Sequence, residues 1–220
     1  MIKLAIFDMD GLMIDSEPLA IQGWKEAARQ QNIQIPDELY PKLIGLNRDL
    51  CKTVMQECLG HSFDFETALT ILHSSVDNHI KIHGLSLKPG LTHILDKLDE
   101  VGIKKCVATS TVTDRAIYKL ERANIVHRFD TIIGGDQVPH SKPAPDIFLK
   151  AAQICKTNPA QCVVLEDSNA GAKGGDLAGM HVIVVPDLDP PTKTTQDQVF
   201  AICNDLYQAC DAILSINCTN

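Results

Sequence analysis

Five short apolar runs, rich in β-branched residues, recur along the 220-residue chain. Each run is continuously apolar and does not alternate with polar residues. This pattern is typical of parallel strands that are buried on both faces of a sheet. The runs cover residues 4–7, 106–109, 131–134, 162–165 and 182–185.

Segments with helical periodicity separate the later runs. They cover residues 113–123, 144–155 and 170–178, and Gly179 follows the last one as a helix stop. Alternation of strands and helices predicts an α/β fold with a Rossmann-like parallel sheet as its core. After Pro186 we expect a loop and then one last short strand or helix.

The interval between the first two runs has a different pattern, because it contains no strand-like segment. Its helical segments are 19–31, 37–44, 48–59 and 65–82. Such an interval is far too long for a simple connection within a sheet. We therefore predict an inserted α-helical cap domain over residues 17–83, and an α/β catalytic core made of residues 1–16 and 84–220.

Composition and charge bear on the binding partner and the cellular location of the protein. The formal net charge is −8, which disfavours binding to nucleic acid and to anionic membranes. No apolar stretch approaches the length of a membrane span. The eight cysteines form no CxxC pair, and the chain starts with a strand and not with a signal peptide. We therefore expect a cytoplasmic monomer whose partner is a small molecule.

Polar side chains follow the predicted strands at the point where each strand ends. Ligands of open parallel sheets bind beyond these carboxyl ends, so the residues should converge there. They are Asp8 and Asp10 after the first strand, Thr109 and Ser110 after the second, Lys142 in the loop that follows the third, and Glu166 and Asp167 after the fourth.

This set of side chains favours phosphoryl transfer. Clustered carboxylates repel one another unless a cation offsets their charge, and carboxylate oxygens are ligands that suit Mg²⁺. A carboxylate can also attack phosphorus and form an aspartyl-phosphate, while a metal ion and a lysine offset the charge of the transferred group. The alternative is that Asp10 has no catalytic role and, together with Gly11, only forms the turn that ends the first strand.

Four motifs carry a family resemblance. DMDG at 8–11, ATS at 108–110, SKPAPDIF at 141–148 and VLEDSNAG at 164–171 occur in this order. The pattern resembles the haloacid dehalogenase-like (HAD) hydrolase superfamily. The helical insertion after the first strand resembles the branch that contains small-molecule phosphatases and β-phosphoglucomutase.

The resemblance implies a role for each residue. Asp8 would be the nucleophile, Asp10 the general acid and base, and Lys142 would bridge the nucleophile and the phosphate. Thr109 and the backbone of Ser110 would bind phosphate. Asp167, helped by Glu166, would hold Mg²⁺ together with the Asp8 carboxylate and the Asp10 carbonyl. In the cap, the loop 45–48 resembles one that faces the active site, where Arg48 would either reach the substrate or be a surface arginine at the start of a helix. Glu17, on the first cap helix, would point into the cleft.

The function expected from this resemblance is a Mg²⁺-dependent phosphatase. It would hydrolyse small phosphomonoesters, such as a sugar phosphate or a nucleoside monophosphate, through an aspartyl-phosphate. A β-phosphoglucomutase-like phosphomutase and a catalytically silent sugar-phosphate sensor are the alternatives. A dehalogenase would not need Asp10 or Asp167. A phospho-accepting receiver module would be shorter and would lack the cap.

One position argues against the mutase. A histidine in the first cap segment of the mutase helps to control the acid/base aspartate, and the matching position here is Ala20. No nearby polar group is expected to replace the histidine, so hydrolysis should follow formation of the aspartyl-phosphate.

Overall fold

A six-stranded parallel sheet forms the centre of the core in the computed structural model, which describes residues 1–43, 45–60 and 62–218. The spatial order of the strands is β3-β2-β1-β4-β5-β6. Because β1 lies between β2 and β4, the carboxyl ends of these three strands are neighbours. The strands are β1 Leu4–Phe7, β2 Lys104–Ala108, β3 Thr131–Ile133, β4 Cys162–Glu166, β5 His181–Val184 and β6 Ala201–Ile202.

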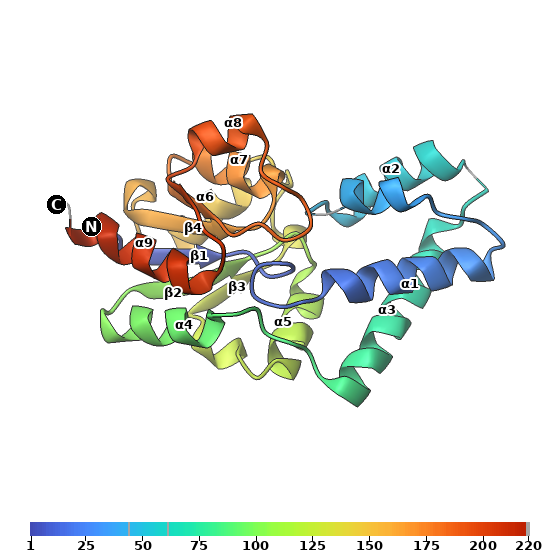
Figure 1. The fold of residues 1–220 in the computed structure, drawn as a ribbon, viewed down its shortest axis with the longest axis horizontal. Coiled ribbons are helices and arrows are strands. Elements are labelled where there is room, and N and C mark those ends of the chain that lie inside the picture. Colours follow the sequence, from blue (N-terminus) through green and yellow to red (C-terminus); the bar gives the residue numbers. More distant parts are fainter. Residues whose placement is uncertain (44, 61, 219–220) are drawn as a thin grey trace.

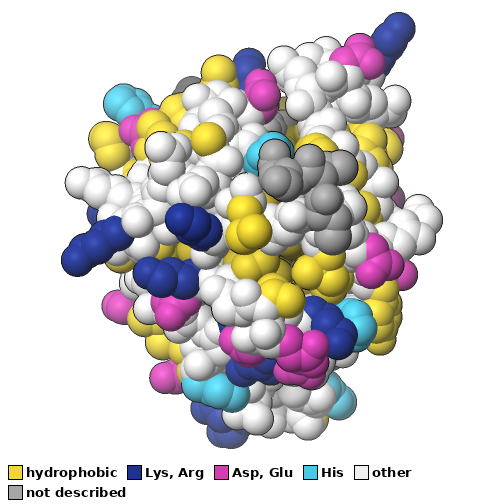
Figure 2. Space-filling view, turned by 90° about the vertical axis from the view of Figure 1, so that its left-hand side faces the viewer, with side chains coloured by type: hydrophobic (Ala, Val, Ile, Leu, Met, Phe, Trp, Pro, Cys, Tyr) yellow, Lys and Arg dark blue, Asp and Glu magenta, His cyan; other side chains and the backbone are white. Residues whose placement is uncertain are grey.

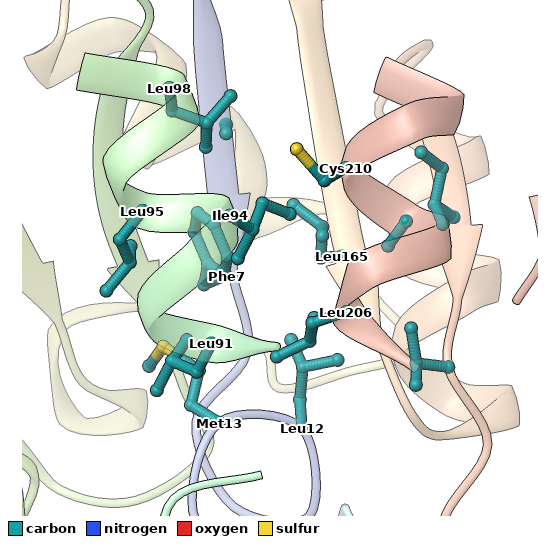
Figure 3. Packing of buried hydrophobic residues seen from close by; sticks show 14 of the residues in the cluster. Phe7, Leu12, Met13, Leu91, Ile94, Leu95, Leu98, Leu165, Leu206 and Cys210 are labelled. Carbon is teal, nitrogen blue, oxygen red and sulfur yellow. The ribbon is translucent and has the colours of Figure 1, made fainter. Parts of the chain in front are cut away.

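Alternate side chains of β1 enter two hydrophobic layers. Ala5 and Phe7 face the helices α4 (Leu91–Glu100), α5 (Thr113–Arg122) and α9 (Leu206–Cys218). Figure 3 shows Phe7 and Leu165 enclosed between α4 and α9. Leu4 and Ile6 face the other layer, which includes α6 (Asp146–Ile154) and α7 (Asn169–Leu177). Burial on both faces explains why these strands have no polar alternation.

A separate helical unit lies beside the carboxyl ends of the strands (Figure 1). It consists of α1 (Glu17–Gln30), the 3₁₀ helix η1 (Asp37–Leu43), α2 (Arg48–Leu59) and α3 (Phe65–His83). Trp24 and Phe65 meet in its own hydrophobic core, with their ring centroids 5.7 Å apart. At Gly23 a Cβ would lie 2.6 Å from Leu72 Cδ1, so the absence of a side chain allows α1 and α3 to approach closely.

The predicted α/β fold, with its Rossmann-like core and helical cap, is confirmed. All five predicted strands are present, with ends that differ from the prediction by up to two residues. The predicted helix 37–44 is a 3₁₀ helix over Asp37–Leu43, and residue 44 lies outside the described residues. The domain boundaries, with the cap at residues 17–83 and the core at 1–16 and 84–220, stay a prediction. Residues 219–220 of the predicted core also lie outside the described residues.

The tail after Pro186 contains α8 (Lys193–Gln198), β6 and α9. The N-terminus and the end of α9 lie at the end of the core remote from the cap (Figure 1). Figure 2 shows this end of the molecule, where acidic and basic side chains are interspersed. Over the described part of the chain, no helix combines the length and the apolar character needed to cross a membrane.

Candidate active site

Lys142 joins two carboxylates at the carboxyl ends of the strands. Its side chain is 2% exposed, and its Nζ donates to Asp8 Oδ1, to Glu166 Oε1 at 2.6 Å and to the backbone oxygen of Ala108 at 3.1 Å. These three bonds use all the donors of an ammonium group. The two carboxylates raise the pKa of Lys142 although its burial opposes this shift, so the lysine is charged.

Glu166 also closes the turn that starts α7. Its Oε2 accepts from the backbone nitrogens of Asp167 and Ser168, both at 3.1 Å, and from Ser168 Oγ at 2.9 Å. The helix approaches this carboxylate at Gly171, where a Cβ would lie 1.8 Å from Glu166 Oε1. Both oxygens of Glu166 therefore have protein partners in this structure.

Asp8, Glu166 and Asp167 form an oxygen-only cluster. One carboxylate oxygen from each lies within 4.8 Å of the other two, and all three residues are buried. Burial, followed by the charge of Glu166, raises the pKa of Asp8 to about 7 against the opposing effect of Lys142. Burial and the charges of Glu166 and Asp8 raise the pKa of Asp167 well above its usual value. One lysine does not offset three buried carboxylates, so the donor set fits Mg²⁺.

Gly11 allows the chain to pass this cluster. It has a φ of +83°, and a Cβ there would lie 2.2 Å from Asp167 Oδ2. The left-handed conformation favours glycine, and the close approach leaves no room for a side chain. The chain can then turn away from the sheet directly after Asp10 and enter the cap.

The Asp10 carboxylate lies apart from the metal-type cluster and has its own partners. It accepts from Ser16 Oγ at 2.5 Å, from Thr111 Oγ1 at 2.7 Å and from Lys119 Nζ at 2.5 Å. Burial raises the pKa of Asp10, but Lys119 and the two hydroxyls lower it by more, so it stays below the usual value. A metal bond from Asp10 would have to use its backbone carbonyl, as the family resemblance implies.

Lys119 is a residue that the sequence analysis missed. It belongs to α5 and forms an ion pair with Asp10, 109 positions away along the chain. The expectation that no polar group near Asp10 takes the place of the mutase histidine is therefore wrong. The ion pair depends on how α5 packs across the loop after β1, and the sequence around Lys119 carries no motif for it.

Thr109 and Ser110 lie at the end of β2 beside Asp8 and Asp10, and all four residues line one cavity. Thr109 is buried, and its Oγ1 accepts from the backbone nitrogen of Thr111 at 3.1 Å. Ser110 Oγ donates to the backbone oxygen of Gly45 in the cap at 2.9 Å. The predicted phosphate-binding residues thus border the cavity where the cap touches the core.

The cavity lies between the cap and the core and has a volume of about 240 Å³. Glu17 lines it, and burial together with the charge of Asp10 raises the pKa of Glu17 to about 7. Arg48 also lines it, but its Nη2 is 2.5 Å from Glu66 Oε2, and half of its side chain is exposed. The structure therefore brings both cap residues to the cavity, with the guanidinium of Arg48 already paired.

Arg115 provides a second contact between cap and core. It lies on α5, its Nη1 donates to Asp77 Oδ2 of α3 at 2.8 Å, and its Nη2 is 2.8 Å from Asp77 Oδ1. The pair thus combines one hydrogen bond with a second ion-pair contact, and it joins α5 to the cap. Sequence reasoning did not find this pair either, because its partners belong to different domains.

The sheet, the carboxylate–lysine cluster and the helical lid over it define a capped α/β enzyme with its site at the strand ends. The chain belongs to the haloacid dehalogenase-like hydrolases, and the model of that family matches residues 5–185. The family resemblance deduced from the four motifs is thereby confirmed.

Individual relatives include both phosphatases and mutases. A phosphorylated carbohydrates phosphatase of Thermotoga maritima is 28% identical over 82% of this chain and 83% of its own. A beta-phosphoglucomutase of Bacillus subtilis is 30% identical over 83% of each chain. The crystal structure of CbbY from Rhodobacter sphaeroides in complex with phosphate superposes with a TM-score of 0.82 at 21% identity, covering 94% of this chain and 95% of the other.

Proposed function

We propose that this enzyme is a Mg²⁺-dependent phosphatase that hydrolyses small phosphomonoesters through an aspartyl-phosphate on Asp8. The observation that carries the proposal is the position of the Asp8 carboxylate. It lines the cavity, contacts the buried ammonium of Lys142 and lies beside the carboxylate of Asp167. A nucleophile that attacks a phosphate dianion needs positive charge at this point. The similarity to a carbohydrate phosphatase supports the same assignment.

In the proposed first step, an Asp8 oxygen attacks phosphorus while Asp10 gives a proton to the leaving oxygen. Thr109 and the backbone of Ser110 bind the phosphate oxygens, and Lys142 bridges the nucleophile and the phosphate by giving up one of its three present hydrogen bonds. When bound by Asp8, Asp167 and the Asp10 carbonyl, Mg²⁺ would offset the negative charge of the phosphate and the carboxylates. In the second step, Asp10 takes a proton from the water that attacks the aspartyl-phosphate.

The contacts of Asp10 suit the second step. Ser16, Thr111 and Lys119 hold it as a carboxylate, which is the form that accepts a proton from water. Donation in the first step requires that Asp10 gain a proton when the substrate enters. For Glu166, the hydrogen bonds favour a role in orienting Lys142 and the α7 turn, and a direct bond to Mg²⁺ stays a prediction.

A phosphomutase is the second candidate, because of the similarity to a beta-phosphoglucomutase. Incubation with β-glucose 1-phosphate and a trace of the 1,6-bisphosphate separates the two functions by ³¹P NMR. We expect inorganic phosphate as the only product, or no reaction. Accumulation of glucose 6-phosphate would instead identify a mutase.

The proposal itself is tested by phosphate release from a panel of phosphomonoesters. Enzyme treated with a chelator should be inactive, and Mg²⁺ should restore its activity, whereas Ca²⁺ should inhibit because it accepts looser and higher coordination. Full activity in excess chelator would disprove the metal assignment. Absence of phosphate release from every compound would disprove the phosphatase assignment.

The remaining expectations concern the binding partner, the oligomeric state and the cellular location of the protein. The net charge of −8 supports a small metabolite, and not a nucleic acid, as the partner. Monomeric state and cytoplasmic location stay predictions.

A further inference from the structure

The cap contributes a largely apolar wall to the active-site cavity. Ile21 and Trp24 line it from α1, and Leu69, Leu72 and Val76 line it from α3. The reacting groups Asp8, Asp10 and Thr109 lie at the other side, on the core. A phosphomonoester whose phosphate lies at Asp8 would therefore direct its leaving group toward this apolar wall.

The cationic side chains around the cavity already have carboxylate partners. Arg48 is paired with Glu66, Arg115 with Asp77 and Lys119 with Asp10. These are the lysine and arginine side chains of the described residues that line the cavity. A second phosphate or a carboxylate on the leaving group would have to displace one of these partners, and it would also lie near the acidic Glu17.

The size and the hydrogen-bonding capacity of the cavity limit the leaving group further. Its volume of about 240 Å³ lies just below the range of about 300–1,000 Å³ that is usual for small-molecule pockets. This gives room for one ring of ordinary size. The buried Tyr40 hydroxyl lines the cavity and has no hydrogen-bond partner among the described residues, so it is free to bond one polar group.

We propose, on the basis of the phosphatase function proposed above, that the leaving group is uncharged and carries one planar, mainly apolar ring. The faces of such a ring would replace water against the side chains of α1 and α3, which favours binding. Apart from Tyr40, Glu17 and His73, the cap side of the cavity offers a polyhydroxylated chain few hydrogen-bond partners, and an acidic group would meet no unpaired lysine or arginine. Phosphomonoesters with one planar, mainly apolar ring are therefore the substrate class, in preference to sugar phosphates, sugar bisphosphates and phosphorylated acids.

Three matched substrates test this proposal. Benzyl phosphate and glucose 6-phosphate both release a primary alcohol, so their intrinsic reactivity is similar, and 4-carboxybenzyl phosphate adds a small, negatively charged group to the ring. We expect kcat/KM for benzyl phosphate to exceed that for each of the other two by about tenfold or more. Equal or higher values for glucose 6-phosphate or for the carboxylated compound would overturn the proposal.

Variants of the apolar wall provide a second test. Leu69→Asn places a polar group at the cavity, and Ile71→Asn is the matched control, because Ile71 is a half-buried residue of the same helix that does not line the cavity. Leu69→Asn should lower the ratio of kcat/KM for benzyl phosphate to that for acetyl phosphate by about fivefold or more, and Ile71→Asn should leave it unchanged. If Leu69→Asn does not fold, Leu46→Asn in the cap loop tests the same wall. An unchanged ratio would overturn the proposal.

Acetyl phosphate separates failure of this inference from failure of the proposed function. It has a small leaving group and needs little of the cap cavity. If neither acetyl phosphate nor any monoester is hydrolysed with Mg²⁺, the phosphatase assignment is wrong and the inference fails with it. If acetyl phosphate is hydrolysed and glucose 6-phosphate is preferred over benzyl phosphate, only the leaving-group inference is wrong.

Discussion

Asp8 and Asp10 are two residues apart and have opposite electrostatic surroundings. Asp8 lies with Glu166 and Asp167, and its pKa is raised to about 7, mainly by burial. Asp10 is partly buried, and Lys119, Ser16 and Thr111 keep its pKa below the usual value although burial acts to raise it. Titratable groups whose surroundings differ in this way take different roles in acid–base chemistry. The local contacts thus support a nucleophile at one position and a proton-transfer group at the other.

At the position of the nucleophile, we predict that Asp8→Asn abolishes turnover and leaves the protein folded. Asparagine has nearly the same shape and removes one charge from the acidic cluster, but it cannot form an aspartyl-phosphate. Phosphate release should fall by more than about a hundredfold. Thermal unfolding of the variant provides the control for folding, and residual activity above that level would contradict the covalent mechanism.

Glu17 yields a prediction about pH. Its pKa is about 7 in the folded protein against 4.5 for the free group, mainly because of burial. Between these two values the folded protein keeps a proton that the unfolded chain has lost, so this residue makes the free energy of unfolding fall as pH rises from 4.5 to about 7. The upper limit of this loss is about 3 kcal/mol.

The variant Glu17→Gln lacks this titration. Its free energy of unfolding should match that of the wild type at about pH 4, below the pKa of the unfolded chain, and it should exceed the wild-type value at about pH 8. Urea unfolding at both pH values measures the two differences. Equal differences at the two pH values would show that Glu17 ionises normally in the folded protein.

Single residues could be predicted from the sequence where a motif places them at the end of a strand. Asp8, Lys142 and Asp167 belong to such motifs, and the structure brings all three to the same cluster of side chains. Lys119 and Arg115 could not be predicted, because they lie on a helix face and reach partners 109 and 38 positions away. Their contacts depend on the packing of α5 and on the placement of the cap.

At the scale of elements, too, some features could be predicted from the sequence and others could not. Strands buried on both faces are predictable, because continuous apolar runs reveal them. β6 has only two residues within the apolar run 199–203, and Ile202 is 44% exposed, so the sequence left open whether this last element is a strand or a helix. The apolar spacing of Leu91, Ile94, Leu95 and Leu98 was a usable signal for α4, which the sequence analysis did not assign. In η1, the proline at position 41 removes a backbone donor, consistent with a 3₁₀ helix in place of the predicted α-helix.

Helix α5 carries a prediction about stability. Lys119 and Asp10 are 14% and 19% exposed, so Lys119→Met leaves a mostly buried carboxylate without its cation. We expect the free energy of unfolding to fall by about 2–4 kcal/mol at neutral pH, since breaking one side of a buried pair is costly. Asp10→Asn in the same background should recover part of this loss.

A double-mutant cycle measures the coupling between the two residues. The effects of Lys119→Met and Asp10→Asn should not add, because each removes the same ion pair. Urea unfolding of the four proteins gives the interaction free energy. Additive effects would show that the pair contributes nothing to stability.

At the scale of the whole molecule, the catalytic groups and the apolar wall belong to different domains. In the proposed function, the strand ends supply the phosphate chemistry and the cap supplies the surface that meets the leaving group. The two parts are connected near the cavity by the Arg115–Asp77 pair and by the bond from Ser110 to Gly45. We therefore expect selectivity to depend on the closed position of the cap, which no single element determines.

We predict that the Arg115–Asp77 pair holds the cap closed over the substrate. Arg115→Gln and Asp77→Asn should each raise KM by about fivefold, because substrate binds to a conformation that is then populated less often. The double variant should raise KM no further than either single variant. Arg122→Gln is the matched control, because this arginine lies on the same helix and contacts the Tyr118 ring without pairing to the cap. Arg115 lines the cavity, whereas Asp77 does not. If KM rises in Arg115→Gln but not in Asp77→Asn, Arg115 binds the substrate directly. That outcome would contradict the role of the pair in cap closure.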